Sequence, residues 1–307
     1  MQTARVCAPP VPFGRTILYA QAALTSPARF EPVIRDVNAR GTRVRFVEAG
    51  VGPPLLLVHG YLSSHRTWED VTPALAERFR VIAPDLPGFG ESEKPSPSRY
   101  AYGFDAFADS LADVVAALGL SRVAVCGHGL GGAVGLTLAA KHPSLVDHLV
   151  LVGPHVYSAR LGFMSRVAGV PIVGPVAFKQ LYGRAMFRRF FKEHVYGTGE
   201  PPWHRIDTHF DLFNVPAARE AAFATTQALL DTRAIVAQVP RVTVPSLVVW
   251  GRGDRCAPIA DGRRLSRELR GARFEVLESG HAPQEECPQA FAHVMTRFLV
   301  EAAGKAA

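Results

Sequence analysis

Ten residues, Val123-Ala-Val-Cys-Gly127-His128-Gly129-Leu130-Gly131-Gly132, decide the fold of this chain. Their apolar start predicts a buried strand, and the small residues that follow predict a closely packed helix. A sharp turn joins the two. Because a Cβ at Gly127 or Gly131 would clash where helix and strand meet, these two glycines have a steric explanation. The middle residue of the turn, Gly129, has no side chain either.

Short apolar runs on both sides of this turn predict further strands. Two alternating stretches at 33–37 and 44–48 predict a hairpin, and continuous runs predict buried strands at 55–58, 80–83, 123–126, 148–152, 247–250 and 274–277. Helical spacing predicts helices at 104–118, 259–269 and 288–303. Strands that alternate with helices indicate an α/β fold: a mostly parallel, eight-stranded sheet flanked by helices.

The interval 155–237 interrupts this alternation, since it is rich in aromatic residues and helix formers and contains no clear buried strand. Its length predicts an inserted helical region. Three parts follow: an N-terminal extension at 1–31, a core at 32–154 and 238–307, and the insertion at 155–237. We expect most of the insertion's aromatic side chains to form its own core and a few to face a pocket. They include Phe163, Phe178, Tyr182, Phe187, Phe190, Phe191, Phe210 and Phe213, with Met164 beside them.

The composition excludes several classes of protein. Of the 307 residues, 48% are hydrophobic and 20% are charged, which excludes a disordered chain, a collagen and a coiled coil. No run of about 18 apolar residues occurs, so we expect no integral membrane association. We expect cytoplasmic thiols rather than disulfides or a zinc site, because the four cysteines are far apart and form no CxxC motif.

The charge is +7, with 34 basic residues, of which 29 are arginine and 5 lysine, against 27 acidic ones. Such a balance can indicate a nucleic-acid partner. The charges are scattered, however, which favours a solvated surface and no nucleic acid. The one cluster, Arg184, Arg188, Arg189 and Lys192, lies mostly on one side of a predicted helix. We interpret it as a solvated face, with a position over an anionic ligand as the alternative.

The central turn resembles the nucleophile elbow G-x-S-x-G of the α/β-hydrolase family. The resemblance extends over about residues 32–303. Four more segments are similar to family motifs. His59-Gly60-Tyr61 resembles the oxyanion loop, and Asp85-Leu-Pro-Gly-Phe-Gly-Glu-Ser92 resembles the turn after the fourth strand. Trp250-Gly-Arg-Gly-Asp254-Arg-Cys-Ala-Pro258 resembles the loop of the triad acid, and Gly280-His281-Ala-Pro283-Gln-Glu-Glu286-Cys-Pro288 resembles the loop of the triad histidine. Their order along the chain also agrees with the family.

The resemblance implies a role for each of these residues. His281 would be the general base, Asp254 would fix its tautomer, and the backbone N–H groups of Tyr61 and Leu130 would face the oxyanion. The insertion would be the family's cap over a pocket for a hydrophobic small molecule. No phosphate loop, dinucleotide fingerprint or metal motif occurs, so we expect no cofactor and no metal.

His128 and Cys256 are close neighbours of these residues in the sequence. We expect His128, next to the elbow position, to point away from the pocket and to pack. Cys256 lies two residues past Asp254, so it could approach the site, but an activated thiol needs a positioned base.

Gly129 occupies the nucleophile position, which leaves three interpretations. The His281–Asp254 pair could act on a substrate or a water directly, without a covalent intermediate. Alternatively, Gly129 replaces the nucleophile of a working hydrolase, either serine or aspartate, with Leu62 and Leu130 favouring serine. Thirdly, the protein is a ligand-binding pseudoenzyme that retains the pocket. Retention of both Asp254 and His281 argues against the third interpretation.

Overall fold

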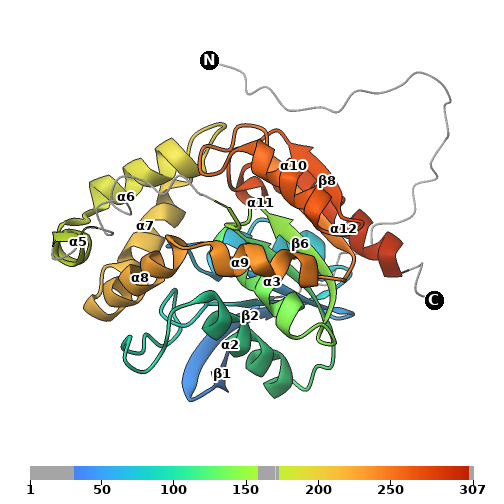
Figure 1. Cartoon of the computed structure of the whole chain (residues 1–307), viewed down its shortest axis with the longest axis horizontal. Helices are drawn as coiled ribbons and strands as arrows, with labels where there is room; N and C mark the ends of the chain where they lie inside the picture. The colour runs from blue at the N-terminus through green and yellow to red at the C-terminus, as the bar shows by residue number, and fades with distance from the viewer. Residues whose placement is uncertain (1–30, 158–169, 171–172, 304–307) are drawn as a thin grey trace.

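The computed structural model describes residues 31–157, 170 and 173–303. In these residues, eight strands form one sheet in the order β1-β2-β4-β3-β5-β6-β7-β8 (Figure 1). The strands are β1 (Val33–Ala39), β2 (Thr42–Ala49), β3 (Pro54–Val58), β4 (Arg80–Pro84), β5 (Val123–His128), β6 (Val146–Val152), β7 (Ser246–Gly251) and β8 (Arg273–Leu277). β1 pairs antiparallel with β2, and β2 with β4; the other neighbours are parallel. The predicted mostly parallel, eight-stranded sheet is confirmed.

Helices cover the sheet and fill the interval between β6 and β7. The helices outside that interval are α1 (Thr72–Ala76), α2 (Phe104–Ala117), α3 (Leu130–Lys141), α10 (Ile259–Glu268), α11 (Pro283–Glu286) and α12 (Pro288–Ala303). Those within it are α5 (Val173–Val176), α6 (Arg184–Phe190), α7 (Trp203–Phe213), α8 (Pro216–Leu229) and α9 (Arg233–Gln238). Short 3-10 or π segments are η1 (His65–Trp68), η2 (Ala177–Leu181), η3 (Phe191–Val195) and η4 (Val239–Arg241).

Both faces of the sheet are buried, which explains why its central strands are continuous apolar runs. In β3, Leu55 and Leu57 pack in a core with α1 and α12, whereas Leu56 and Val58 pack in a second core with α2, α3 and α10. Successive side chains on a strand point to opposite faces, so a strand between two helical layers must be apolar at every position.

The strand order creates a crevice at the centre of the sheet. The chain passes from β3 to β4 on one side and then returns to β5 on the other side of β3. The connections that leave β3 and β5 therefore diverge at their carboxyl ends, and ligands of open parallel sheets bind at such a switch point. Gly60 lies two residues after β3, and Gly129 directly follows β5.

Between β6 and β7, aromatic rings pack against one another. Phe187 contacts Phe213 at a ring-centroid distance of 5.7 Å and Phe210 at 5.5 Å, and Tyr182 lies 5.6 Å from Phe213. Helices α5, α6, α7 and α8 gather beside the sheet, at the left of Figure 1. The limits 155–237 stay a prediction. Phe163, Met164 and residues 1–30 of the predicted extension lie outside the described residues.

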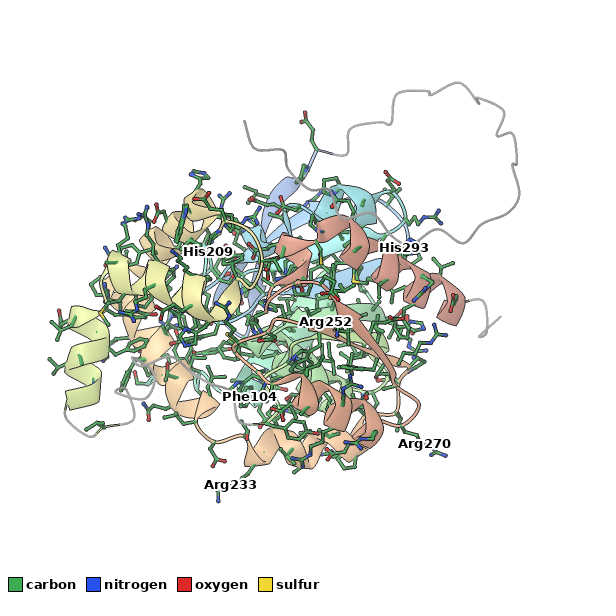
Figure 2. The ribbon with its side chains drawn as sticks, turned by 90° about the horizontal axis from the view of Figure 1, so that it is seen from above. Phe104, His209, Arg233, Arg252, Arg270 and His293 are labelled. Atoms are coloured by element: carbon green, nitrogen blue, oxygen red, sulfur yellow. The ribbon has the colours of Figure 1, made fainter. Side chains whose placement is uncertain are left out.

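The three arginines of the basic cluster, which lie on α6, pair with acidic neighbours. Arg184 and Arg188 both pair with Asp207, and Arg189 pairs with Glu193 at 2.9 Å. Elsewhere arginines extend outward separately, as Arg233 and Arg270 do in Figure 2. These contacts agree with the solvated face predicted for the cluster. Of the described helices, none is long and apolar enough to span a membrane.

Candidate active site

Gly129 forms the turn between β5 and α3. Its backbone has φ 52° and ψ −111°, a conformation that residues with a Cβ adopt only under strain. Its N–H donates to Val152 O at 2.9 Å, which fixes the turn to the neighbouring strand β6. A Cβ built on Gly129 would lie 3.3 Å from His281 Nε2 and 3.9 Å from the Gly60 Cα. The direction in which a side chain would extend is therefore toward the imidazole.

The two outer glycines allow α3 to lie against the sheet. A Cβ on Gly127 would be 2.2 Å from Gly131 O, and a Cβ on Gly131 would be 2.2 Å from Val58 O. Both obstructing atoms belong to the backbone, so neither clash can be relieved by a rotamer change. The steric explanation given to these residues from the sequence is confirmed.

Asp254 and His281 come from the loops after β7 and β8. His281 Nδ1 lies 2.8 Å from Asp254 Oδ2. The other carboxylate oxygen accepts the N–H groups of Cys256 at 2.8 Å and Ala257 at 2.9 Å, so the carboxylate cannot rotate freely. A carboxylate at this position requires the proton of neutral His281 to be on Nδ1, which leaves Nε2 as an acceptor facing Gly129.

A cavity of about 70 Å³ lies over this turn, enough for several water molecules or the reacting part of a small substrate. Its surface is mainly apolar. The lining residues are Gly60, Tyr61, Ser63, Thr67, His128, Gly129, Leu130, Gly153, His155, Phe190, Phe191, Val195, Leu229, Cys256, Ala257, His281 and Glu285. Among the described aromatic residues of the insertion from Phe178 to Phe213, Phe190 and Phe191 line the pocket, in agreement with the expectation that a few would face it.

The loop after β3 is held by His59, whose tautomer is determined by its partners. Nε2 accepts the Leu86 N–H at 3.0 Å, so Nδ1 carries the proton and donates to Gly60 O at 2.7 Å. Burial lowers the pKa of His59, which keeps the ring neutral. Tyr61 follows, and its hydroxyl donates to Ala222 O at 3.0 Å in α8. The loop is therefore fixed to both β4 and the inserted helices.

The expectation that His128 points away from the pocket is wrong. His128 lines the cavity, and its ring centroid lies 4.7 Å from that of His281. Its Nε2 donates to His281 O at 2.9 Å, while its buried Nδ1 has no hydrogen-bond partner in the described part of the chain. The prediction assumed the strict alternation of a strand, but the backbone turns at Gly129 and the adjacent side chain folds back over the turn.

Three residues that had no role in the prediction from motifs also belong to the site. Glu285 and His155 line the cavity, and Gly153 lets the dyad form, since a Cβ there would lie 3.0 Å from His281 Nδ1. Signals for them exist: Glu285 lies four residues after His281, and Gly153-Pro-His155 follows the carboxyl end of a buried strand. Neither signal is specific without the structure.

Cys256 lies beside the dyad but is a poor nucleophile or ligand there. Donor atoms of Asp254, Cys256 and His281 all lie within 4.8 Å of one another, the one group of described residues with the composition of a metal site. The thiol donates to His194 O at 3.3 Å. Burial, and then the charge of Asp254, raise the pKa of Cys256 well above its ordinary value, so the thiol stays protonated.

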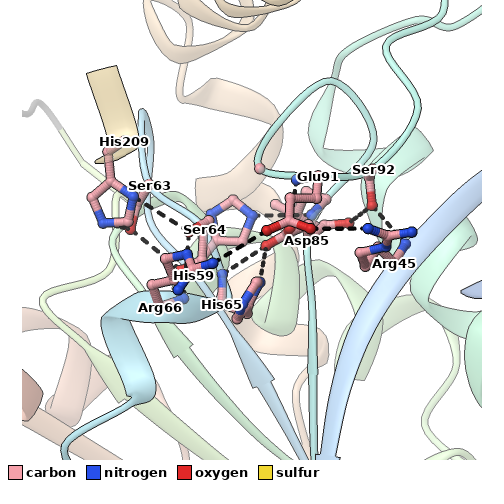
Figure 3. A network of polar contacts seen from close by, with 12 residues as sticks. Arg45, His59, Ser63, Ser64, His65, Arg66, Asp85, Glu91, Ser92 and His209 are labelled. Atoms are coloured by element: carbon pink, nitrogen blue, oxygen red, sulfur yellow. Dashed lines mark hydrogen bonds and ion pairs between the residues drawn. The ribbon is translucent and has the colours of Figure 1, made fainter. Parts of the chain in front are cut away.

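A polar network joins the inserted helices to the loop after β3 (Figure 3). His209 on α7 lies between Ser63 and Ser64, at 3.4 and 3.3 Å. Farther along, His65 contacts buried Asp85 through its N–H and Nδ1, at 2.7 and 3.0 Å. Burial acts to raise the pKa of Asp85, but the His65 contacts outweigh it and the pKa lies below its ordinary value. The network fixes the loop after β3 beneath the inserted helices.

Comparison with known proteins agrees with this fold. The model of the alpha/beta hydrolase fold family matches residues 53–288, and the chain therefore belongs to this family. An uncharacterised protein of Mycobacterium tuberculosis is 32% identical over 286 residues, which cover 87% of this chain and 81% of that protein. Haloalkane dehalogenase 2 of the same species is 31% identical over 273 residues, 85% of this chain and 93% of the relative. Among solved structures, a serine hydrolase involved in carbazole degradation superposes with a TM-score of 0.73 at 28% identity, covering 88% of this chain and 99% of the other.

Proposed function

We propose that this chain is a hydrolase of small hydrophobic molecules in which the His281–Asp254 dyad acts on a water at the place of the absent nucleophile side chain. One observation carries the proposal: the Cβ direction at Gly129 ends 3.3 Å from the free Nε2 of His281. Water bound there would donate a hydrogen bond to this nitrogen. The apolar lining from Leu130, Phe190 and Leu229 favours a hydrophobic substrate.

The reaction would proceed without an acyl-enzyme. His281 Nε2 takes a proton from the water, whose oxygen attacks the carbonyl carbon of an ester or related acyl compound. The N–H groups of Tyr61 and Leu130 face the resulting oxyanion; Leu130 begins α3, so its N–H has no acceptor within the helix. The intermediate then collapses, the bond to the leaving group breaks, and the proton on His281 passes to the departing oxygen.

Such a site retains only part of the power of a complete triad. An oxyanion hole and substrate binding alone give about 10³–10⁴-fold catalysis over water. A second function is supported by the same Cβ direction: a serine-type hydrolase in which glycine replaces the nucleophile. The two differ in the activity expected of the unaltered chain, which the first predicts to depend on His281 and the second predicts to be negligible.

Gly129→Ser is expected to raise the hydrolysis of short-chain and medium-chain aryl esters by at least about 10²-fold, because the new hydroxyl would contact a base that is already oriented. The measurement is kcat/KM across the ester panel, with thermal melting to verify folding. The serine should lower stability by about 1–3 kcal/mol, because residue 129 has a positive φ. Gly129→Asp, tested in parallel on haloalkanes, examines the aspartate alternative.

Gly129→Ala is the matched control, because it introduces the same backbone strain and no nucleophile. Its methyl group would occupy the proposed place of the water, so it should abolish any activity of the unaltered chain. No gain on any ester in a folded Gly129→Ser protein, together with no His281-dependent hydrolysis by the unaltered chain, would overturn the hydrolase proposal and leave ligand binding as the function.

A further inference from the structure

The cavity contains one acidic side chain and no lysine or arginine among its lining residues. The acid is Glu285 on α11, whose side chain is only 5% exposed. Its position one helical turn beyond His281 brings a negative charge into the same apolar cavity as the proposed base. This charge plays no part in the proposed reaction.

The Glu285 carboxylate receives three hydrogen bonds. Oε1 accepts from the Thr67 hydroxyl, and Oε2 accepts from the Tyr196 hydroxyl at 2.6 Å and from Arg205 Nη1 at 2.9 Å. Burial raises the pKa of Glu285, and the charge of Arg205 opposes this shift. Arg205 also pairs with Asp70 at 2.9 Å. Arg205 Nη2 also lies 3.9 Å from Glu69 Oε2, so this one cation is shared among three carboxylates.

Two histidines line the cavity, and both use their Nε2–H groups on backbone carbonyl oxygens, so neither Nε2–H is available as a donor to a ligand. His128 Nε2 donates to a carbonyl oxygen, and so does His155 Nε2, to Leu229 O at 2.9 Å. In the neutral rings each Nδ1 is therefore an acceptor. Burial lowers the pKa of His128 well below its ordinary value and that of His155 to about 4, so both rings are neutral at physiological pH. The buried Nδ1 of His128, on a ring 6% exposed, has no partner among the described residues.

The side-chain donors of the cavity are already engaged by the protein. The Tyr61 hydroxyl donates to Ala222 O, the Cys256 thiol to His194 O, and the Thr67 hydroxyl to Glu285. Ser63 has weaker contacts, at 3.4 Å to His209 and 3.5 Å to Ser64 O. Apart from the backbone N–H groups assigned to the oxyanion, the hydrogen-bonding capacity that remains is mainly that of acceptors.

We infer that this cavity selects ligands that carry hydrogen-bond donors, neutral or cationic, and rejects carboxylates, with Glu285 as the specificity-determining residue. A carboxylate ligand would enter a low-dielectric space beside a carboxylate with no cation to pair with. An amidinium or ammonium group would form a charge-assisted hydrogen bond with Glu285. The inference deepens the proposed function, since it defines the substrate class of the same cavity, but its test requires binding only.

Three planar probes of nearly equal shape test it: benzamidine, benzamide and benzoate, with charges of +1, 0 and −1. Their dissociation constants for the unaltered chain, measured by calorimetry, are expected to increase from benzamidine to benzamide to benzoate. The constants of benzamidine and benzoate should differ by about tenfold or more. This order is measured without any substitution, so it does not depend on the folding of a variant.

Glu285→Gln should remove most of the preference for benzamidine, while Glu278→Gln should retain it. Glu278 is a matched control: it pairs with Arg252 on the surface, and its side chain is 68% exposed. Benzoate binding as tight as benzamidine binding, an unchanged preference in folded Glu285→Gln, or no binding of any probe up to about 10 mM would each overturn the inference. Failure of the proposed hydrolysis alone would appear in the Gly129→Ser assay and leave this order intact.

Discussion

The two oxygens of the Asp254 carboxylate have different partners, and this difference determines how an asparagine side chain would be oriented in its place. Oδ1 accepts two backbone N–H groups, from Cys256 and Ala257, while Oδ2 faces His281 Nδ1. An asparagine would keep its oxygen at the two N–H donors. Its NH₂ group would then face Nδ1, which would have to become the acceptor, and the proton of the ring would move to Nε2.

Asp254→Asn in the Gly129→Ser background is therefore expected to lower kcat/KM by about 10⁴-fold, because the base carries its proton on the wrong nitrogen. The melting temperature should change little, since size and backbone contacts are retained. Steady-state kinetics and the ring-nitrogen NMR shifts of His281 provide the two measurements. Asp147→Asn, at a partly exposed surface pair with Arg122, is the control and should leave kcat/KM unchanged. Equal activity in both variants would exclude a tautomeric role for Asp254.

At the residue scale, the sequence predicts which residues lie together better than it predicts the directions of their side chains. The loops carrying Asp254 and His281 could be found from their motifs, because each motif follows a predicted strand. The direction of His128 could not, because it depends on a turn whose φ and ψ no residue pattern specifies. Glu285 was missed for a related reason: a glutamate next to another glutamate on a short helix is ordinarily solvated, and its burial results from Arg205, 80 residues earlier.

At the scale of elements, the contact between β5 and α3 depends on two residues without side chains. The strand was expected to end at 126 but continues to His128, because Gly127 and His128 pair with Leu151 and Val152 of β6. Glycine has a low strand propensity, so the strand predicted from the apolar run ends too early, at residue 126. The ladder to β6 outweighs that preference. Other limits predicted for strands and helices differ from the observed ones by two residues or fewer.

Gly127→Ala should destabilise the protein by about 1–3 kcal/mol or more, because its Cβ would lie 2.2 Å from a backbone oxygen of α3. The measurement is the midpoint of urea unfolding followed by far-UV circular dichroism. Gly183→Ala is the matched control, since no atom lies within 4 Å of a Cβ there and its φ of −85° suits alanine. If both substitutions shifted the midpoint equally, close packing at the elbow would not be the cause.

At the scale of the whole molecule, buried neutral histidines hold the inserted helices against the core. His155 follows β6 and bonds α8, and His209 on α7 contacts the loop after β3. Burial lowers the pKa of His155 to about 4 and that of His209 to about 3, from an ordinary value near 6.5. As the pH falls below 6.5, the unfolded chain gains these protons first, so the folded state loses stability.

The free energy of unfolding is therefore expected to decrease between pH 6.5 and 4, by about 3 kcal/mol for His155 alone at about 1.4 kcal/mol per pKa unit. Thermal melting across this range measures it. His155→Gln and His209→Gln should each flatten the decrease. His204→Gln, at an exposed position on α7, should not. A pH dependence unaltered in all three variants would assign the loss to other groups.

The α/β-hydrolase fold and an apolar pocket could be predicted from alternation and motif order, but most of the residues that line the cavity could not. Its wall combines residues from the loops after β3, β5, β6, β7 and β8 with α6, η3 and α8. Which aromatic side chains of the insertion turn inward depends on how those helices settle on the sheet. Periodicity identifies the apolar face of a helix but not its neighbour, so Phe190 and Phe191 could be proposed only as members of a larger set.

The contact between His128 and His281 joins residues 153 positions apart in the chain. Because synthesis runs from residue 128 toward residue 281, the turn is made well before the imidazole that it contacts. An unfinished chain can thus form the scaffold of the sheet up to β6 while it lacks its base altogether. Contacts so distant in sequence also form slowly. Any reactivity of this centre would accordingly begin only after His281 has been synthesised and has reached the turn at Gly129.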